Sequence, residues 1–275
     1  MNNSKIFFFD LDGTLLNSKK EISLVTKNAL KTFTDQGNHF CICTGRPLLS
    51  AIDIYKKLQL DYKGSYLIGF NGSQIYDVDN KKIIYKIGVP HDTIMDIWDM
   101  ADNMGIHIQT FNESYIISTK EDEEIKVYQK RVGIPVKFLP KEKILEEMSE
   151  DEPAKLIAID MNDHLKLEKL RDEIQLKHGN KLTALFSSNC HLEIFNINSG
   201  KGNAVIKLCN ILNIPKENSL AAGDQENDIS MIKAAGIGIA MINGVDEVKK
   251  IADVITKKIM IMMDWLNLFS KNEIY

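Results

Sequence analysis

Short apolar runs that end in acidic, hydroxyl or cationic residues constrain the fold of this chain more than any other feature. They lead into polar clusters at 10–14, 44–46 and 223–228, and a Lys201 flanked by glycines follows another such run. Short continuous apolar runs are typical of strands buried on both faces of a parallel sheet. Open α/β sheets form their binding crevice at the carboxyl ends of such strands. The sequence therefore predicts one site assembled from four distant segments.

Strand-like and helix-like segments alternate at both ends of the chain. Strands are expected at 6–9, 40–43 and 66–70, with a helix at 23–36 and a second helix opened by Pro47. The alternation returns later, with helices expected at 203–212 and 228–235 and strands at 220–223 and 236–240. This order predicts an α/β fold, a Rossmann-like, doubly wound core around a parallel sheet.

The middle of the chain has a different character. A length of 275 residues favours one large domain plus a smaller one. Half-exposed strands alternate with helices between about 80 and 190, and 141–152 reads as a charged helix face or loop. We expect a core formed by 1–82 and 189–275, interrupted by an α+β domain at 83–188.

Composition excludes several functional classes. The net charge of −4 argues against a nucleic-acid surface, and no apolar run approaches the ~20 residues of a membrane span. The N-terminal apolar stretch is too short for a signal peptide. The cysteines lack the spacing of a metal site and read as reduced thiols; they are Cys41, Cys43, Cys190 and Cys209. A cytoplasmic protein is expected, without nucleic-acid or membrane partners.

Asp10 and Asp12 form a carboxylate pair directly after the first predicted strand. Two close carboxylates repel unless a cation lies nearby or one is protonated. Asp10 could attack phosphorus as a nucleophile, and Asp12 could protonate the leaving alcohol and then deprotonate water. Gly13 lets backbone approach, and Thr14 could cap the turn. The alternative is an acidic, solvated loop.

Thr44, Gly45 and Arg46 follow the second predicted strand and precede a helix. The Thr44 hydroxyl and the following backbone amides could hold phosphate oxygens, as donors before a helix often do. The alternative is a simple helix cap at Thr44.

Lys201 stands between two glycines, but the surrounding sequence does not form a nucleotide-binding P-loop. That motif needs a glycine where Phe195 stands and a hydroxyl residue where Gly202 stands. A lone cation at a helix start could instead neutralise Asp10 and a transferring phosphoryl group. An exposed, structural lysine is the alternative.

Asp224 and Asp228 follow the strand at 220–223. If one ends the strand and the other opens a helix, both can face the Asp10 loop. Carboxylates together with a phosphate form the oxygen-rich surroundings that Mg²⁺ prefers. Glu226 is expected to face outward, and an acidic turn that caps a helix is the alternative for Asp228.

Taken together, these residues resemble the haloacid dehalogenase superfamily of phosphatases, and in detail its Cof-type branch with a large inserted cap. The similarity extends to about Thr256. It implies catalytic roles for Asp10 and Asp12, and Mg²⁺ ligation by Asp10, Asp12 (through its backbone carbonyl), Asp224 and Asp228. It further implies phosphate or substrate contacts for Leu11, Thr44, Gly45, Arg46, Lys201 and Asn227.

The resemblance implies a Mg²⁺-dependent hydrolase of small phosphate monoesters, with sugar phosphates or phosphorylated cofactors as substrates and a monomer or homodimer as the assembly. The cap at 83–188 would close over the site and choose the substrate. A phosphomutase that shares the nucleophile is the nearest alternative. A phosphoacceptor signalling module is more remote, because such modules are shorter and lack the inserted domain.

The segment 259–265 departs from the family pattern, which continues with an Asn/Asp-rich turn and then glycine. Here the chain is rich in methionine and isoleucine. Back-translated and read in a shifted frame, this segment gives Asn-Asp-Asn-Asp-Gly-Leu, and we hypothesise a frameshift in the gene or in its recorded sequence. The alternative is an amphipathic helix, and resequencing the gene distinguishes the two.

Overall fold

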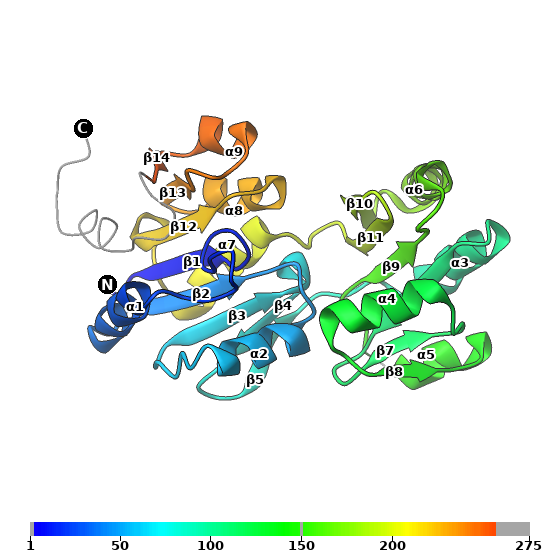
Figure 1. The fold of residues 1–275 in the computed structure, drawn as a ribbon, viewed down its shortest axis with the longest axis horizontal. Helices are drawn as coiled ribbons and strands as arrows, with labels where there is room; N and C mark the ends of the chain where they lie inside the picture. The colour runs from blue at the N-terminus through cyan, green and yellow to red at the C-terminus, as the bar shows by residue number, and fades with distance from the viewer. Residues whose placement is uncertain (1–2, 149–150, 257–275) are drawn as a thin grey trace. The chain divides into compact units, whose positions relative to one another are not determined.

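A computed structural model describes residues 3–148 and 151–256 of the chain (Figure 1). The chain divides into two compact units, one formed by Met1–Tyr85 with Gly200–Tyr275 and the other by Lys86–Ser199. The segment 259–265, on which the frameshift hypothesis rests, lies outside the described residues.

The first unit is built on a sheet with the strand order β14-β13-β12-β1-β2-β3-β4-β5 among the described residues. Neighbouring strands from β14 to β3 run parallel, whereas β4 pairs antiparallel with β3. The strands are β1 (Ile6–Asp10), β2 (His39–Cys43), β3 (Ser65–Gly69), β4 (Gln74–Asp77), β5 (Lys82–Lys86), β12 (Ser219–Gly223), β13 (Ile237–Ala240) and β14 (Val254–Ile255).

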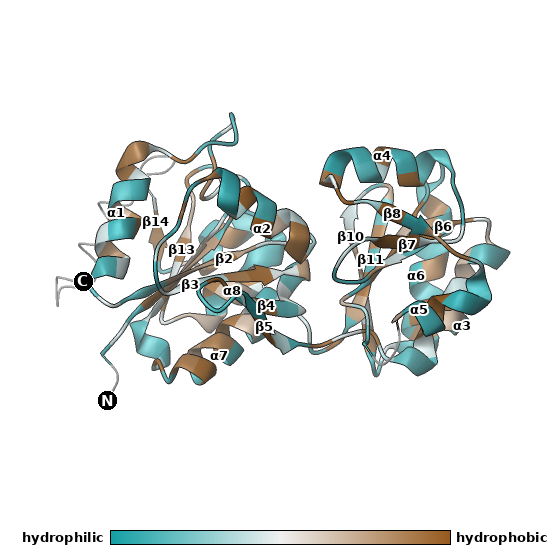
Figure 2. Ribbon diagram, turned by 90° about the horizontal axis from the view of Figure 1, so that it is seen from below, coloured by the Kyte–Doolittle hydropathy of each residue, from teal (hydrophilic) through white to brown (hydrophobic). Residues whose placement is uncertain are grey.

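Helices cover both faces of this sheet. On β1, Ile6 and Phe8 pack in one cluster with residues of α7 and α8, and because side chains alternate along a strand, Phe7 and Phe9 point to the opposite face. Figure 2 shows α1 and α2 on the side of the sheet away from α7. The helices are α1 (Leu24–Asp35), α2 (Leu48–Lys57), α7 (Lys201–Leu212), α8 (Ile229–Ala234) and α9 (Asp246–Ile251). The prediction of a doubly wound core is confirmed.

The second unit has its own sheet, with the order β10-β11-β9-β6-β7-β8 among the described residues. Its strands are β6 (His107–Phe111), β7 (Ile116–Ser118), β8 (Val136–Phe138), β9 (Leu156–Ile159), β10 (Leu182–Ser188) and β11 (His191–Asn196). All of their pairings are antiparallel except that of β7 with β8. The unit is therefore α+β, as expected.

Helices α3 (His91–Asn103), α5 (Ile144–Met148) and α6 (His164–His178) bury one face of this sheet around Trp98. Helix α4 (Glu123–Val132) lies on the opposite side (Figure 2), where Tyr128 packs against Phe111 of β6. The charged segment 141–152 is thus not wholly solvated, because Ile144 and Met148 of α5 are buried.

Both boundaries of the insertion differ from the expected positions. We expected 83–188, but β5 belongs to the first sheet and the second unit extends to Ser199. The larger difference arises because β11 pairs with β9 and β10, so the strand at 191–196 completes the second sheet. Within the described residues, no helix has the length and apolar character needed to cross a membrane.

Candidate active site

Asp10 ends β1 and contacts the cation that sequence analysis singled out. Its Oδ1 accepts a hydrogen bond of 2.6 Å from Nζ of Lys201, the first residue of α7. The same Nζ donates to Oδ1 of Asp228 over 2.6 Å. Lys201 is only 1% exposed, so the alternative of an exposed, structural lysine is wrong. A buried ammonium is tolerated here because two carboxylates surround it.

Asp228 holds the turn that follows β12. Its Oδ2 accepts hydrogen bonds from the backbone N–H groups of Asp224 (2.9 Å) and Gln225 (3.0 Å), while the Gln225 side chain accepts from the Asp228 backbone in a capping box. A Cβ on Gly223 would lie 2.4 Å from the Cβ of Asp228, so only glycine fits at the end of this strand. Both oxygens of Asp228 are therefore already hydrogen bonded.

Asp224 is fixed by side chains from its own turn and from the β1 loop. Its Oδ1 accepts from the Thr14 hydroxyl over 2.7 Å, and its Oδ2 accepts from Nε2 of Gln225 over 3.1 Å. Gly13 has a φ of +88°, and a Cβ there would lie 2.5 Å from Oδ2 of Asp224. Thr14 thus bonds Asp224 instead of capping a turn, and Gly13 permits the close approach.

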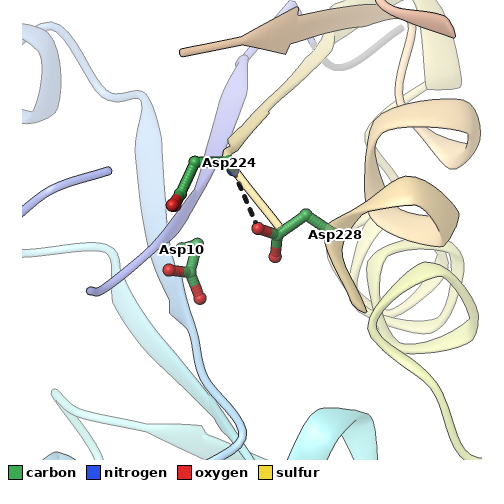
Figure 3. A group of neighbouring side chains, drawn as sticks. All are labelled: Asp10, Asp224 and Asp228. Carbon is green, nitrogen blue, oxygen red and sulfur yellow. Dashed lines mark hydrogen bonds between the residues drawn. The ribbon is translucent and has the colours of Figure 1, made fainter. Parts of the chain in front are cut away.

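Asp10, Asp224 and Asp228 converge in Figure 3. One carboxylate oxygen from each lies within 4.8 Å of the others, and all three residues are buried. Three carboxylates face the single ammonium of Lys201, so the cluster has a surplus of negative charge when ionised. Buried hard oxygen donors with surplus charge fit a small divalent cation such as Mg²⁺.

Burial has opposite effects on the two charged partners at the centre. It raises the pKa of Asp10 to about 7, because the attraction of Lys201 offsets the effect of burial only in part and Asp228 and Asp224 add repulsion. Burial alone would lower the pKa of Lys201, but the carboxylates of Asp10 and Asp228 outweigh it and raise that pKa above its usual value. Lys201 therefore stays charged, while Asp10 needs further positive charge to be fully ionised near neutral pH.

Asp12 points to a different set of partners. Arg46 donates to both of its oxygens, from Nε over 2.9 Å and from Nη2 over 3.1 Å, and Lys20 donates from Nζ over 2.6 Å. Partial burial opposes ionisation, but these contacts outweigh it and lower the pKa of Asp12. Lys20 was missed by sequence analysis, because nothing local distinguishes it from its neighbour Lys19.

The remaining predicted residues lie around this centre. Thr44 is buried beyond the end of β2, and its hydroxyl accepts from the backbone N–H of Arg46 over 3.2 Å. The cap of α2 is Pro47, so Thr44 is not the helix cap. The Leu11 side chain is buried in the core, which leaves its backbone as the part able to meet a phosphate. Glu226 is exposed, as expected.

Asn227 and Gly45 both approach Asn71, which directly follows the strand expected at 66–70 and was not among the predicted site residues. Nδ2 of Asn227 donates to Oδ1 of Asn71 over 3.3 Å, and a Cβ on Gly45 would lie 3.0 Å from that same oxygen. The signal that could have identified Asn71 is its place in an Asn-Gly pair directly after a buried strand.

A cavity of about 400 Å³ lies elsewhere in the first unit. Its lining includes Tyr55, Tyr62 and Tyr76, next to the loop that enters β3 at its amino end. Because the acidic cluster lies at the carboxyl ends of β1 and β12, this cavity is separate from it.

The position of the acidic cluster defines the class of protein. Chain order runs outward from β1 through β2 and β3 on one side and from β12 through β13 and β14 on the other. The cluster lies where β1 and β12 end, which is the topological switch point that binds ligands in open α/β sheets. The fold and site thus define an α/β enzyme core with an inserted α+β unit.

The chain belongs to the haloacid dehalogenase-like hydrolases, whose family model matches residues 7–260. The enzyme 5-amino-6-(5-phospho-D-ribitylamino)uracil phosphatase YcsE of Bacillus subtilis is 32% identical over 92% of this chain and 89% of its own. YwtE of the same organism carries the same enzyme name and is 29% identical, with 92% and 93% covered.

A solved haloacid dehalogenase-like hydrolase from Bacteroides thetaiotaomicron has a TM-score of 0.81 and 27% identity, covering 92% of this chain and 94% of that one. The resemblance to this superfamily and its Cof-type branch is confirmed.

Proposed function

We propose that this hydrolase is a Mg²⁺-dependent phosphatase of small-molecule phosphate monoesters, with Asp10 as its nucleophile. The observation that carries the proposal is the buried Asp10 carboxylate at the switch point, in contact with Lys201 and beside two further carboxylates. A carboxylate nucleophile needs nearby positive charge to approach a phosphate dianion, and this site provides it.

In the first half-reaction an oxygen of Asp10 attacks phosphorus, and the bond between phosphorus and the leaving alcohol oxygen breaks. The product is an aspartyl phosphate, and Asp12 donates the proton that the alcohol takes up. Asp12 is held by Arg46 and Lys20 in the structure. We infer that a phosphate draws Arg46 towards itself, since a guanidinium binds a phosphate with two hydrogen bonds just as it binds a carboxylate. The loss of this contact removes part of what keeps the pKa of Asp12 low, so that Asp12 can carry the proton that it donates.

In the second half-reaction Asp12 takes a proton from water, and the water oxygen attacks phosphorus. The acyl phosphate bond to Asp10 breaks, inorganic phosphate leaves, and the Asp10 carboxylate is restored. We assign phosphate contacts to Lys201, which contacts Asp10, to Thr44 and Asn227, and to the backbone N–H groups of Gly45, Arg46 and Leu11.

Asp10, Asp224 and the backbone carbonyl of Asp12 would hold the Mg²⁺ ion. When bound, it supplies positive charge that neutralises the phosphate oxygens and the nucleophile. Asp228 is within the cluster, but its oxygens accept from the Lys201 cation and from two backbone amides, whereas each oxygen of Asp224 accepts from one neutral side chain. We therefore assign Asp228 to positioning Lys201 and Asp224 and not to direct ligation.

We assign substrate selection to the second unit, Lys86–Ser199, because the first unit contains all of the residues proposed for the chemistry. Sugar phosphates and phosphorylated cofactors remain two candidate classes. The name shared by YcsE and YwtE adds a third, the phosphate ester of a ribityl chain attached to a pyrimidine.

The test is phosphate release from a panel of monoesters that includes hexose phosphates, flavin mononucleotide, pyridoxal phosphate and the ribitylaminouracil phosphate. Reactions are run with Mg²⁺, with EDTA, and with Asp10→Asn. We expect release that requires the metal and that falls by at least about a thousandfold in the variant, because the nucleophile is removed. Asp53→Asn, on the exposed face of α2, is the matched control and should retain full activity.

Two outcomes would contradict the proposal. Undiminished release by Asp10→Asn would exclude this residue as the nucleophile. Transfer of phosphate within a substrate, dependent on a bisphosphorylated activator and without free phosphate, would identify a phosphomutase instead.

A further inference from the structure

The turn after β3 has an unusual backbone. Phe70, Asn71 and Gly72 form η1 (Phe70–Gly72) and have φ values of 51°, 54° and 103°. Glycine adopts such values readily and asparagine does so occasionally, but a bulky side chain such as phenylalanine rarely does. Strained conformations of this kind persist only where their surroundings impose them, and they concentrate at functional sites.

The surroundings that impose this turn are the predicted site loops. The backbone N–H of Phe70 donates to the Arg46 carbonyl over 2.9 Å, and that of Asn71 donates to the Thr44 carbonyl over 3.1 Å. A Cβ on Gly72 would lie 2.2 Å from the carbonyl oxygen of Gly200, the residue before Lys201. The backbone of this turn therefore contacts two of the four segments predicted to form the site, the Thr44–Arg46 loop and the segment around Lys201.

The Asn71 side chain reaches a third segment. Its Oδ1 accepts from Nδ2 of Asn227 over 3.3 Å, in the turn that also contains Asp228. The same carboxamide lies over Gly45, where a Cβ would come within 3.0–3.4 Å of its Oδ1, Nδ2 and Cγ atoms. An extended backbone at Asn71 would direct this side chain elsewhere, so the left-handed conformation is what places it between the two loops.

We propose that Asn71 is a positioning residue of the phosphate site. Its carboxamide fixes the orientation of the Asn227 carboxamide and sets the spacing between the Thr44–Arg46 loop and the Asn227 turn, so that both meet the phosphoryl oxygens without rearrangement. The proposal rests on the proposed function, because Asn227 and the Thr44 loop act there on phosphate. Preorganised donors matter more in the transition state than in substrate binding, so Asn71 acts chiefly on kcat.

Asn71→Gly is the sharpest variant, because glycine keeps the left-handed backbone and removes only the side chain. We expect an unchanged unfolding midpoint and a kcat about five- to tenfold lower, the loss of one neutral hydrogen bond, with little change in KM. Gln59→Gly is the matched control. Gln59 is exposed and has a φ of 55° at the end of α2, so its replacement should leave kcat unchanged.

A double-mutant cycle with Asn227→Ala separates positioning from a merely structural role. If Asn71 acts through Asn227, Asn71→Gly costs little further kcat once Asn227 is alanine, so the two losses are not additive. Additive losses, or a kcat for Asn71→Gly equal to that of the wild type, would overturn the proposal.

Asn71→Asp provides a second variant should the glycine variant fold poorly. Aspartate tolerates the left-handed backbone and keeps an acceptor for Asn227. It should retain more of kcat than Asn71→Gly and raise KM, since its charge repels the phosphate; a kcat as low as that of Asn71→Gly would count against the proposal. The wild-type assay runs alongside, because an inactive wild type contradicts the proposed function and not the role of Asn71.

Discussion

Lys201 is buried, although lysine side chains usually lie at the surface, because its neighbours are carboxylates. Lysine is normally exposed, yet the Lys201 side chain is buried between Asp10 and Asp228 at the start of α7. Removing a charge from such a buried group leaves its partners without compensation. The ion pair is thus a structural as well as a chemical part of the site.

We expect Lys201→Met to lower the free energy of unfolding by about 3–5 kcal/mol, the typical effect of removing one partner from a buried ion pair. Denaturant unfolding measures this, with the exposed Lys250→Met on α9 as the control. A loss no larger than that of the control would mean that the ion pair contributes nothing net to stability.

His191, in β11, links stability to pH. Burial lowers the pKa of His191 to about 4 from its ordinary 6.5, assisted by Arg131 and Lys155 and opposed by Glu193. Between these two pH values the unfolded chain binds a proton that the folded chain does not, so stability falls as pH decreases through this window and stops falling near pH 4. His191→Gln should remove this part of the pH dependence. Equal falls in unfolding midpoint for wild type and variant, measured from pH 7 to pH 4.5, would contradict it.

At the residue scale, the sequence predicted those contacts that follow from position on a strand. Asp10 is the last residue of β1 and Asp224 directly follows β12, so the parallel pairing of these two strands brings the residues together. Lys20 and Asn71 escaped prediction because their partners are set by loop paths, which have no periodic pattern in sequence. The φ of Lys20, 62°, is a property of its loop and not of lysine.

At the scale of elements, α7 and α8 can pack closely because Gly202 has no side chain at their contact. A Cβ on Gly202 would lie 2.5 Å from the carbonyl oxygen of Ser230. Because Gly202 follows Lys201 in the first turn of α7, the spacing of these helices also sets the position of the ammonium.

We expect Gly202→Ala to destabilise the protein by about 1–3 kcal/mol, as overpacking of a close contact does, and to lower phosphate release by displacing Lys201. Asn210→Ala, on the exposed side of the same helix, is the control and should be neutral or slightly stabilising because alanine favours helix. A free energy of unfolding for Gly202→Ala equal to that of the wild type would show that α8 can shift without destabilising the protein.

The expected elements were mostly present, but the expected boundary at 188 left the strand at 191–196 in the wrong unit. The run at 191–196 reads as a buried strand in either domain, and only its pairing with β9 and β10 decides between them. Similarly, β4 and β5 extend the first sheet beyond its parallel part. Strand pairing is a long-range property, so a local pattern predicts that a strand exists and not where it pairs.

At the scale of the whole molecule, each unit has a hydrophobic core of its own. The acidic cluster belongs entirely to the first unit. A ligand of this cluster should therefore act first on the stability of that unit.

We expect Mg²⁺ to slow amide hydrogen exchange in β1, β12 and the turn around Asp228, and to leave the sheet of the second unit unchanged. At a concentration of 100 times its dissociation constant, a ligand stabilises by about 2.7 kcal/mol. Asp224→Asn should abolish the protection. Equal protection in wild type and variant would place the metal elsewhere.

The interruption of the first unit also has a consequence for the time at which the site can form. Thr14 and Asp224 bond directly although they are 210 positions apart in the chain, and β1 lies between strands from opposite sides of the insertion. A ribosome that adds roughly 5–20 residues per second needs roughly ten to forty seconds to make that stretch. The continuous second unit can fold within that interval, while the apolar strand β1 still lacks its pairing partner β12. A growing chain of this protein would thus need protection from aggregation longest at its earliest strand.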